Sequence, residues 1–165
     1  MTFFQILDRV IAGVEKAVVA GGMIVISASV ITNVFCREVG IIIIGAEEID
    51  EFSIIWVTFF GTALCARQGI HIIMSALIDR IPEKQRKPLI TTICAVTGVF
   101  SLILAFLGVQ LVLAVLSRGQ VSPALRIPVG YFYIAAPMGF LLTGIHYIRT
   151  FVRNIREDGI YLGVE

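Results

Sequence analysis

The segment Leu89–Leu116, LITTICAVTGVFSLILAFLGVQLVLAVL, decides the fold of this chain. It contains no Asp, Glu, Lys or Arg, and it is longer than the roughly 20 apolar residues that cross about 30 Å of hydrocarbon as a helix. It therefore predicts a transmembrane helix that tilts or projects beyond the hydrocarbon. The whole chain agrees, because its 165 residues are 58% hydrophobic with a mean hydropathy of +0.94, whereas soluble domains are roughly 45–50% apolar.

Three further segments have the same character, at residues 17–35, 49–66 and 129–148. The second of these is the weakest, because its uncharged run begins only at Phe52 and its first turn must come from the acidic residues before it. We expect the first segment to be a retained anchor and not a cleaved signal peptide. The sequence thus predicts an all-α integral membrane protein, with residues 1–165 forming a single domain of four transmembrane helices.

A different pattern fills residues 69–81, between the second and third spans. Its apolar residues recur at helical spacing and its polar residues fall on another face. The apolar set is Ile70, Ile73, Met74, Leu77 and Ile81. This pattern predicts a short amphipathic helix in the membrane interface, in contact with lipid and ended by Pro82.

The positive charges predict the orientation of the spans. The side that carries both termini and the central loop holds most of the 13 Lys and Arg residues, whereas the other side holds only Arg37, Arg118 and Arg126. Because Lys and Arg near span ends are retained in the cytoplasm, we expect both termini to be cytoplasmic.

Composition argues against several classes of function. The sequence shows no basic and aromatic surface of the kind that nucleic acid needs, which argues against nucleic-acid binding. The three cysteines, Cys36, Cys65 and Cys94, form no CxxC pair, so we interpret them as reduced packing residues. The spans carry almost no ionisable group at mid-membrane depth, and Gln110 is expected to hydrogen-bond to a neighbouring helix. We therefore expect no catalytic residue, metal site or cofactor in this chain, and a partner that performs the chemistry.

Small residues recur at helix-packing spacing on two spans. The two stripes are Thr97, Ser101 and Ala105, and Ala135, Gly139 and Thr143. Packing within the chain and docking on a partner both explain them. Pro137 frees a backbone carbonyl one turn earlier, so the fourth span is expected to be kinked or compensated by its neighbours.

The second span has charged residues at both ends. Its acidic start is favoured by the helix dipole, and it is either a solvated cap or an ion-pair site for a partner's basic residues or for Arg118 and Arg126. Trp56 lies about two turns into this helix, as a lipid-facing residue or an anchor against another protein. Arg67 and His71 close the span, where Arg67 suits the helix C-terminus and is placed to reach lipid phosphates.

Taken in order, these residues resemble the small membrane subunit of tripartite ATP-independent periplasmic (TRAP) transporters, the DctQ-like family, over essentially the whole chain. The resemblance rests on Glu47-Glu48, Trp56, Phe60-Gly61, Arg67, Gly69 and His71, and on Ile127-Pro128, Tyr131 and Pro137-Met138-Gly139-Phe140. The chain departs from the family pattern in Val129-Gly130, where Met-Trp is common, and in Gly45-Ala46, where an aromatic residue is commoner.

The resemblance implies a small, non-catalytic scaffold subunit in the bacterial cytoplasmic membrane. It would brace a large multi-span subunit that carries substrate and sodium ions, so sodium is expected on that partner. An extracytoplasmic binding protein would deliver an organic acid such as a dicarboxylate, a keto acid or sialic acid. The alternatives are a stand-alone small channel or exporter and a membrane thiol enzyme.

Twelve residues are candidates for contacts with partner subunits or lipid, and none is expected to be catalytic or to bind substrate. They are Glu47, Glu48, Glu51, Trp56, Arg67, His71, Arg118, Arg126, Pro128, Tyr131, Pro137 and Gly139.

Overall fold

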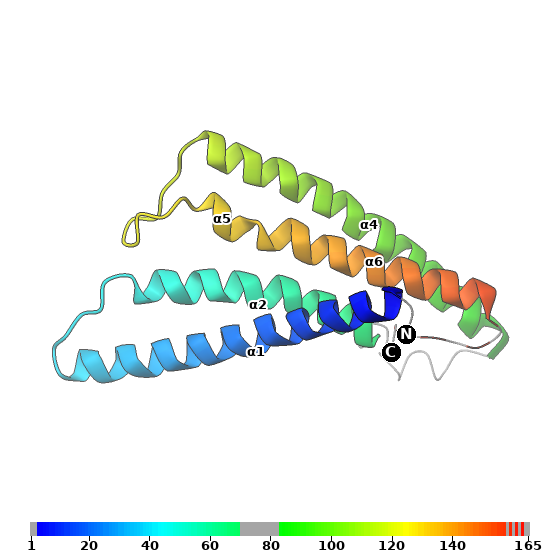
Figure 1. Ribbon diagram of the computed structural model, residues 1–165, viewed down its shortest axis with the longest axis horizontal. Helices are drawn as coiled ribbons and strands as arrows, with labels where there is room; N and C mark the ends of the chain where they lie inside the picture. Colours follow the sequence, from blue (N-terminus) through cyan, green and yellow to red (C-terminus); the bar gives the residue numbers. More distant parts are fainter. Residues whose placement is uncertain (1–2, 70–82, 158, 160, 162, 164–165) are drawn as a thin grey trace.

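The structure is a computed structural model that describes residues 3–69, 83–157, 159, 161 and 163. Five helices lie in these ranges (Figure 1). They are α1 (Phe3–Glu38), α2 (Ala46–Gln68), α4 (Glu83–Ser117), α5 (Gly130–Tyr133) and α6 (Ala135–Arg156). The interfacial helix predicted at 69–81 lies almost wholly outside the described residues, so it stays a prediction.

Four stretches are long and apolar enough to cross a membrane, which confirms the predicted fold class. They are Asp8–Glu38, Ala46–Gln68, Gln85–Ser117 and Gly130–Arg156. Helices α1, α2 and α4 run past the predicted spans at both ends, and α6 runs past the fourth span at its C-terminal end. The largest difference is at the N-terminal end of the first span, which includes Glu15.

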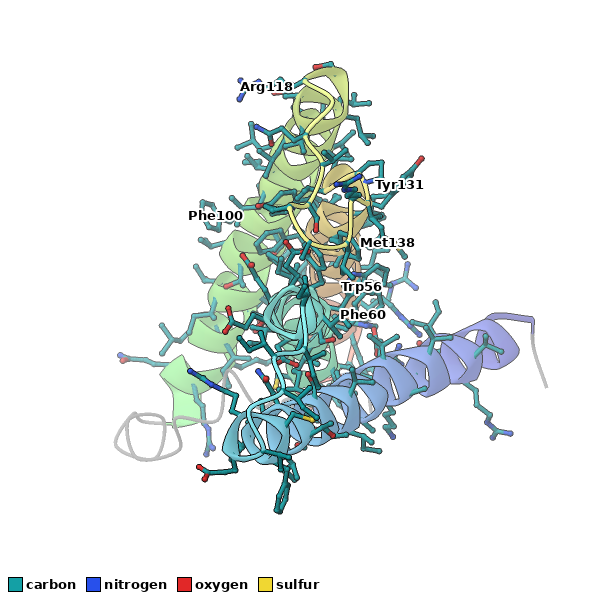
Figure 2. All side chains as sticks on the ribbon, turned by 90° about the vertical axis from the view of Figure 1, so that its left-hand side faces the viewer. Trp56, Phe60, Phe100, Arg118, Tyr131 and Met138 are labelled. Carbon is teal, nitrogen blue, oxygen red and sulfur yellow. The ribbon has the colours of Figure 1, made fainter. Side chains whose placement is uncertain are left out.

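The helices pack in a row, in the order α1, α2, α6, α4 (Figures 1 and 2). Helix α6 lies between α2 and α4, and α2 lies between α1 and α6. Helices α1 and α4 therefore occupy the two edges, and much of each is exposed. Because the row does not close into a bundle, it presents two broad faces to its surroundings.

Glycine and proline set the ends of these helices. Helix α2 is flanked by Gly45 (φ 92°) and Gly69 (φ 69°), left-handed conformations that favour glycine, and the Gly69 N–H bonds to Ala66 O. Helix α5 is separated from α6 at Ile134, about one turn before Pro137. Because proline has no N–H, Pro137 cannot donate the helical hydrogen bond to the Tyr133 carbonyl. The irregularity predicted from Pro137 is therefore present.

One small-residue stripe is used inside the chain. Ala135 is fully buried, and a Cβ atom on Gly139 would lie 2.6 Å from the Phe59 carbonyl oxygen of α2. Gly108 of α4 makes a similar close approach to Pro137 of α6, where an added Cβ would lie 3.3 Å from the ring. Short side chains thus allow α6 to pack closely against both neighbours.

Candidate functional site

A cluster of charged side chains joins three helices at the end of the row where both termini lie, here called the terminal end (Figure 1). The terminal network consists of Asp8 and Glu15 of α1, Arg67 of α2, and His146 and Arg149 of α6. Arg67 donates through Nε to Glu15 Oε2 (2.7 Å) and through Nη1 to Asp8 Oδ1 (3.0 Å). His146 Nε2 lies 2.8 Å from Glu15 Oε1, and Arg149 Nη1 lies 2.5 Å from Asp8 Oδ1.

The centre of the terminal network is buried inside the chain. Glu15 is 0% exposed, and Arg67 and His146 are each 1% exposed. Glu15 Oε2 accepts from Arg67 Nε, and Glu15 Oε1 lies within hydrogen-bonding distance of His146 Nε2, whereas Arg67 Nη2 and His146 Nδ1 have no hydrogen-bond partner among the described residues. Breaking such a buried pair costs more than a surface pair contributes, because the remaining charge stays desolvated.

This geometry corrects two expectations. Arg67 does not reach lipid phosphates, because its side chain is enclosed by the carboxylates of α1. The spans do contain buried charge, since Glu15 and Arg67 both lie within candidate spans. Sequence reasoning missed Glu15 because it preceded the predicted start of the first span. The available signal was the spacing of Asp8 and Glu15, which are seven residues apart on one helical face.

A second polar contact lies at the opposite end of the row, the loop end, where loops 39–45 and 118–129 connect the helices. Glu48 accepts hydrogen bonds from the Ser122 hydroxyl, from Ala124 N (2.8 Å) and from Leu125 N (3.0 Å). In the described chain Glu48 therefore binds the backbone of loop 118–129, and it pairs with neither Arg118 nor Arg126.

The other charged candidates at the loop end, two glutamates and two arginines, are exposed. Glu47 and Glu51 are exposed on α2, and Arg118 and Arg126 are exposed on loop 118–129. Arg126 has a φ of 55°, a left-handed conformation that lies within the loop held by Glu48. Their role as ion-pair partners for another subunit stays a prediction.

The aromatic residues of the loop end pack on one another. Phe52 stacks on Phe132 with ring centroids 3.5 Å apart, and Trp56 stacks on Phe60 at 5.5 Å. Trp56 is half-buried and lines a groove of about 490 Å³ between α1, α2 and α5. Figure 2 shows Trp56, Met138 and Tyr131 on the same side of the row.

The C-terminal residues fold back over the terminal end. The Asn154 side chain donates to Tyr161 O (2.7 Å) and accepts from Tyr161 N (2.8 Å), while the Arg153 guanidinium lies 3.8 Å from the Tyr161 ring centroid. A hydrogen bond from the Tyr161 hydroxyl, assisted by Arg153, lowers the pKa of Glu157. Gly163 is buried against the C-terminal end of α2.

The other candidates are distributed along the fourth span. Tyr131 is 57% exposed, Pro128 is half-buried, and Pro137 and Gly139 are buried within the chain. His71 lies outside the described residues. Gln110 is exposed on α4 and has no hydrogen-bond partner among the described residues, so the expected bond to a neighbouring helix is wrong there.

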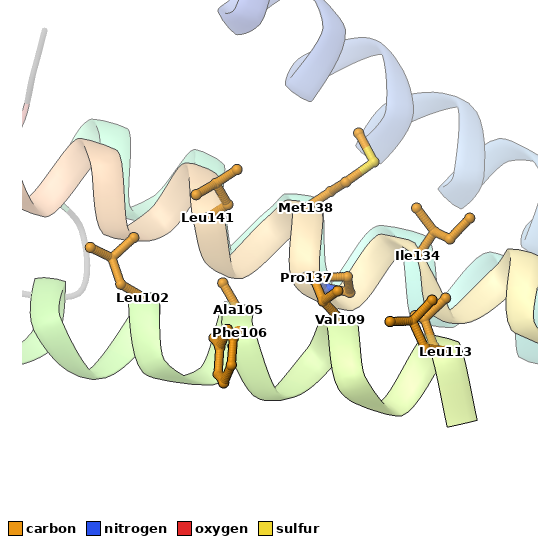
Figure 3. A pocket seen from close by; sticks show the side chains of 10 residues that line it. Leu102, Ala105, Phe106, Val109, Leu113, Ile134, Pro137, Met138 and Leu141 are labelled. Carbon is orange, nitrogen blue, oxygen red and sulfur yellow. The ribbon is translucent and has the colours of Figure 1, made fainter. Parts of the chain in front are cut away.

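Two open grooves flank the contact between α4 and α6. One is almost wholly apolar, has a volume of about 500 Å³ and is lined by residues that include Phe106, Val109, Met138 and Leu141 (Figure 3). The other, of about 360 Å³, is lined partly by hydroxyl-bearing residues. Across residues 8–69 and 85–157, no group of three or more His, Cys, Asp or Glu side chains is placed to hold a metal ion.

Comparison with known proteins identifies the family. The family model for the DctQ component of tripartite ATP-independent periplasmic transporters matches residues 26–157. The chain is 32% identical over 157 residues to the ectoine TRAP transporter small permease protein TeaB of Halomonas elongata, covering 94% of this chain and 81% of that protein.

In two further relatives, the segment similar to this chain makes up less than half of the protein. The C4-dicarboxylate TRAP transporter small permease protein DctQ of Rhodobacter capsulatus is 31% identical over 110 residues, which are 67% of this chain and 48% of that protein. The isethionate TRAP transporter permease protein DctMQ of Oleidesulfovibrio alaskensis is 22% identical over 163 residues, which are 93% of this chain and 25% of that protein. These relatives are transporter permease proteins and not enzymes. The chain therefore belongs to the DctQ family and is a small membrane component of a TRAP transporter.

Proposed function

We propose that this chain is the non-catalytic scaffold subunit of a sodium-coupled TRAP transporter for organic acids, and that it braces the large transport subunit. The observation that carries the proposal is the pairing within the terminal network. The buried Glu15 carboxylate bonds to the buried Arg67 and His146, and the partly exposed Asp8 bonds to Arg67 and to the exposed Arg149. These bonds connect α1 to α2 and α6, which supports a role of the terminal network in holding the helices in place.

The partners follow from the family and from the longer relatives. In DctMQ the segment similar to this chain is a quarter of the protein, which supports a large membrane subunit as the neighbour of this chain. An extracytoplasmic binding protein completes the proposed transporter. In this proposal both substrate and sodium bind to the large subunit, because the carboxylates of the terminal network already pair with side chains of other helices.

The proposed substrate class is an organic acid. The names of the relatives mention ectoine, C4-dicarboxylates and isethionate. All three are small charged metabolites. We place the chain in the bacterial cytoplasmic membrane with both termini in the cytoplasm, because the terminal end carries most of the Lys and Arg residues.

Copurification and transport test this function together. A tagged chain expressed with the genes that neighbour it is expected to recover a large membrane subunit in mild detergent. Uptake in proteoliposomes is expected to need both subunits, the binding protein and a sodium gradient. Recovery of this chain alone, together with unimpaired uptake in a strain that lacks it, would contradict the proposal.

A further inference from the structure

The two grooves beside α4 and α6 differ in chemistry and lie on opposite faces of the row. The apolar groove contains Phe106 and Met138 (Figure 3). The second groove, here called the hydroxyl groove, contains Phe100 and the hydroxyl residues Thr62, Thr97, Ser101 and Thr143. Figure 2 shows Phe100 on the side opposite Met138.

A membrane treats these grooves differently. Lipid chains are as apolar as leucine, so they fill an apolar groove without a protein partner, but they offer no hydrogen bond to a hydroxyl group. Small and hydroxyl residues are enriched where transmembrane helices meet, because they allow close backbone approach and hydrogen bonds across the contact. The hydroxyl groove therefore suits a protein helix better than the apolar groove does.

Thr143 gives independent evidence for a missing partner. Its side chain is 3% exposed and lines the hydroxyl groove, yet Oγ1 has no hydrogen-bond partner among the described residues. Thr62 on the same groove is satisfied within its own helix, since its Oγ1 donates to the Thr58 carbonyl (2.8 Å). A buried hydroxyl without a partner is costly in an apolar medium.

We propose that the hydroxyl groove receives a transmembrane helix of the large transporter subunit, which approaches closely at Thr97 and Ser101 and hydrogen-bonds to Thr143. This inference rests on the proposed function, which supplies the large subunit as partner. The occupant is this subunit because DctMQ carries a segment like this chain within a permease four times as long as the match. In DctMQ the segment like this chain and the rest of the permease are parts of one polypeptide, so they occur in equal numbers.

Blocking each groove with the same side chain compares the two faces. Thr97→Trp fills the hydroxyl groove, and Val109→Trp on the same helix fills the apolar groove. With the full complex in mild detergent, recovery of the large subunit is expected to fall at least about tenfold for Thr97→Trp and to stay within about twofold for Val109→Trp. Equal recovery, or a greater loss with Val109→Trp, would overturn the proposal.

Thr143→Val separates partner binding from folding. Removing an unsatisfied hydroxyl is expected to leave the melting temperature of the isolated chain unchanged or raised, whereas recovery of the large subunit falls about threefold, the worth of one hydrogen bond between membrane helices. A purely structural threonine would instead lower both quantities together. Unchanged recovery would also count against the groove as the docking site.

Crosslinking identifies the occupant. The native thiols are first removed by Cys36→Ser, Cys65→Ser and Cys94→Ser. In this background we compare Phe100→Cys with Phe106→Cys. Both phenylalanines lie on α4, and they are 58% and 64% exposed. A bifunctional thiol-to-amine or photoactivated reagent is expected to join position 100, and not 106, to the large subunit. A product of twice this chain's mass, or a lipid adduct alone, would overturn the proposal.

If the wild-type chain does not copurify with a large subunit, the proposed function fails. If it does and position 100 gives no adduct, only the groove assignment fails.

Discussion

At the residue scale, Glu15 is the side chain on which the terminal end depends. Its two oxygens bind Arg67 of α2 and His146 of α6, and these partners are 52 and 131 residues away in the chain. Helix α1 otherwise packs along α2. Glu15 therefore attaches α1 to the rest of the row as well as neutralising Arg67.

Glu15→Gln is expected to destabilise the isolated chain by about 3–5 kcal/mol, because the Arg67 charge stays buried with less compensation. Thermal unfolding in detergent measures this change. Arg9→Gln, an exposed charge on the same helix, is the control and should change stability by less than about 0.5 kcal/mol. The double change Glu15→Met with Arg67→Met should recover much of the loss, and failure to do so would indicate that the charges have a role beyond their mutual pairing.

Gly139→Ala tests the close approach of α6 to α2. The added Cβ would lie 2.6 Å from the Phe59 backbone, so the helices must separate, at a cost of about 1–3 kcal/mol. Gly21→Ala in α1 is the matched control, because no atom lies within 4 Å of its added Cβ. That variant should be neutral or stabilising by up to about 1 kcal/mol, through helix propensity. Equal melting temperatures for the two variants would contradict the packing.

At the element scale, loop 118–129 is held in place by one carboxylate from another helix. Glu48 accepts from Ser122 Oγ and from the backbone N–H groups of Ala124 and Leu125. Antiparallel pairing of Val121 with Pro128 closes the loop itself. The N-terminal end of α2 is thereby joined to the connection between α4 and α5.

Glu48→Ala is expected to release this loop, because the Ser122 hydroxyl and the backbone N–H groups of Ala124 and Leu125 lose the charged acceptor that they share. Limited proteolysis in loop 118–129 should become faster, and recovery of the large subunit should fall. Glu47→Ala removes an exposed carboxylate one residue earlier and should leave proteolysis unchanged. If both variants are cleaved at the wild-type rate, Glu48 does not hold the loop.

At the scale of the whole molecule, a row of helices with two open faces is suited to lie against a larger body. Trp56 lines a groove on one face with Phe52 and Phe132, while Phe100 stands on the other. The structure thus offers more than one surface to lipid and partner. The hydroxyl groove differs from the others in having an unsatisfied buried polar atom, Thr143 Oγ1, among the described residues.

Trp56→Ala is expected to reduce recovery of the complex, because truncating this half-buried indole removes apolar surface from the groove at the loop end. The isolated chain should lose stability as well, since Trp56 stacks on Phe60. Comparison with Tyr131→Ala, which removes a 57% exposed ring, tells packing within the chain from contact with a partner. Wild-type recovery for both variants would remove these residues from the interface.

The number of spans and the irregularity that Pro137 introduces into the fourth span were predictable from the sequence, because each depends on neighbouring residues. A run such as Leu89–Leu116 is apolar wherever it lies, and Pro137 lacks its N–H in any fold. The same holds for the membrane location, since hydropathy is a sum along the chain.

Only the tertiary structure decided which faces meet. Glu15 was placed outside the first span, Arg67 was expected at the lipid surface, and Glu48 was given arginine partners in place of backbone N–H groups. Each of these side chains forms hydrogen bonds to residues more than 50 positions away. Such pairing depends on the order of helices in the row and on their rotation, and residues that are distant in the chain meet only when the helices have packed.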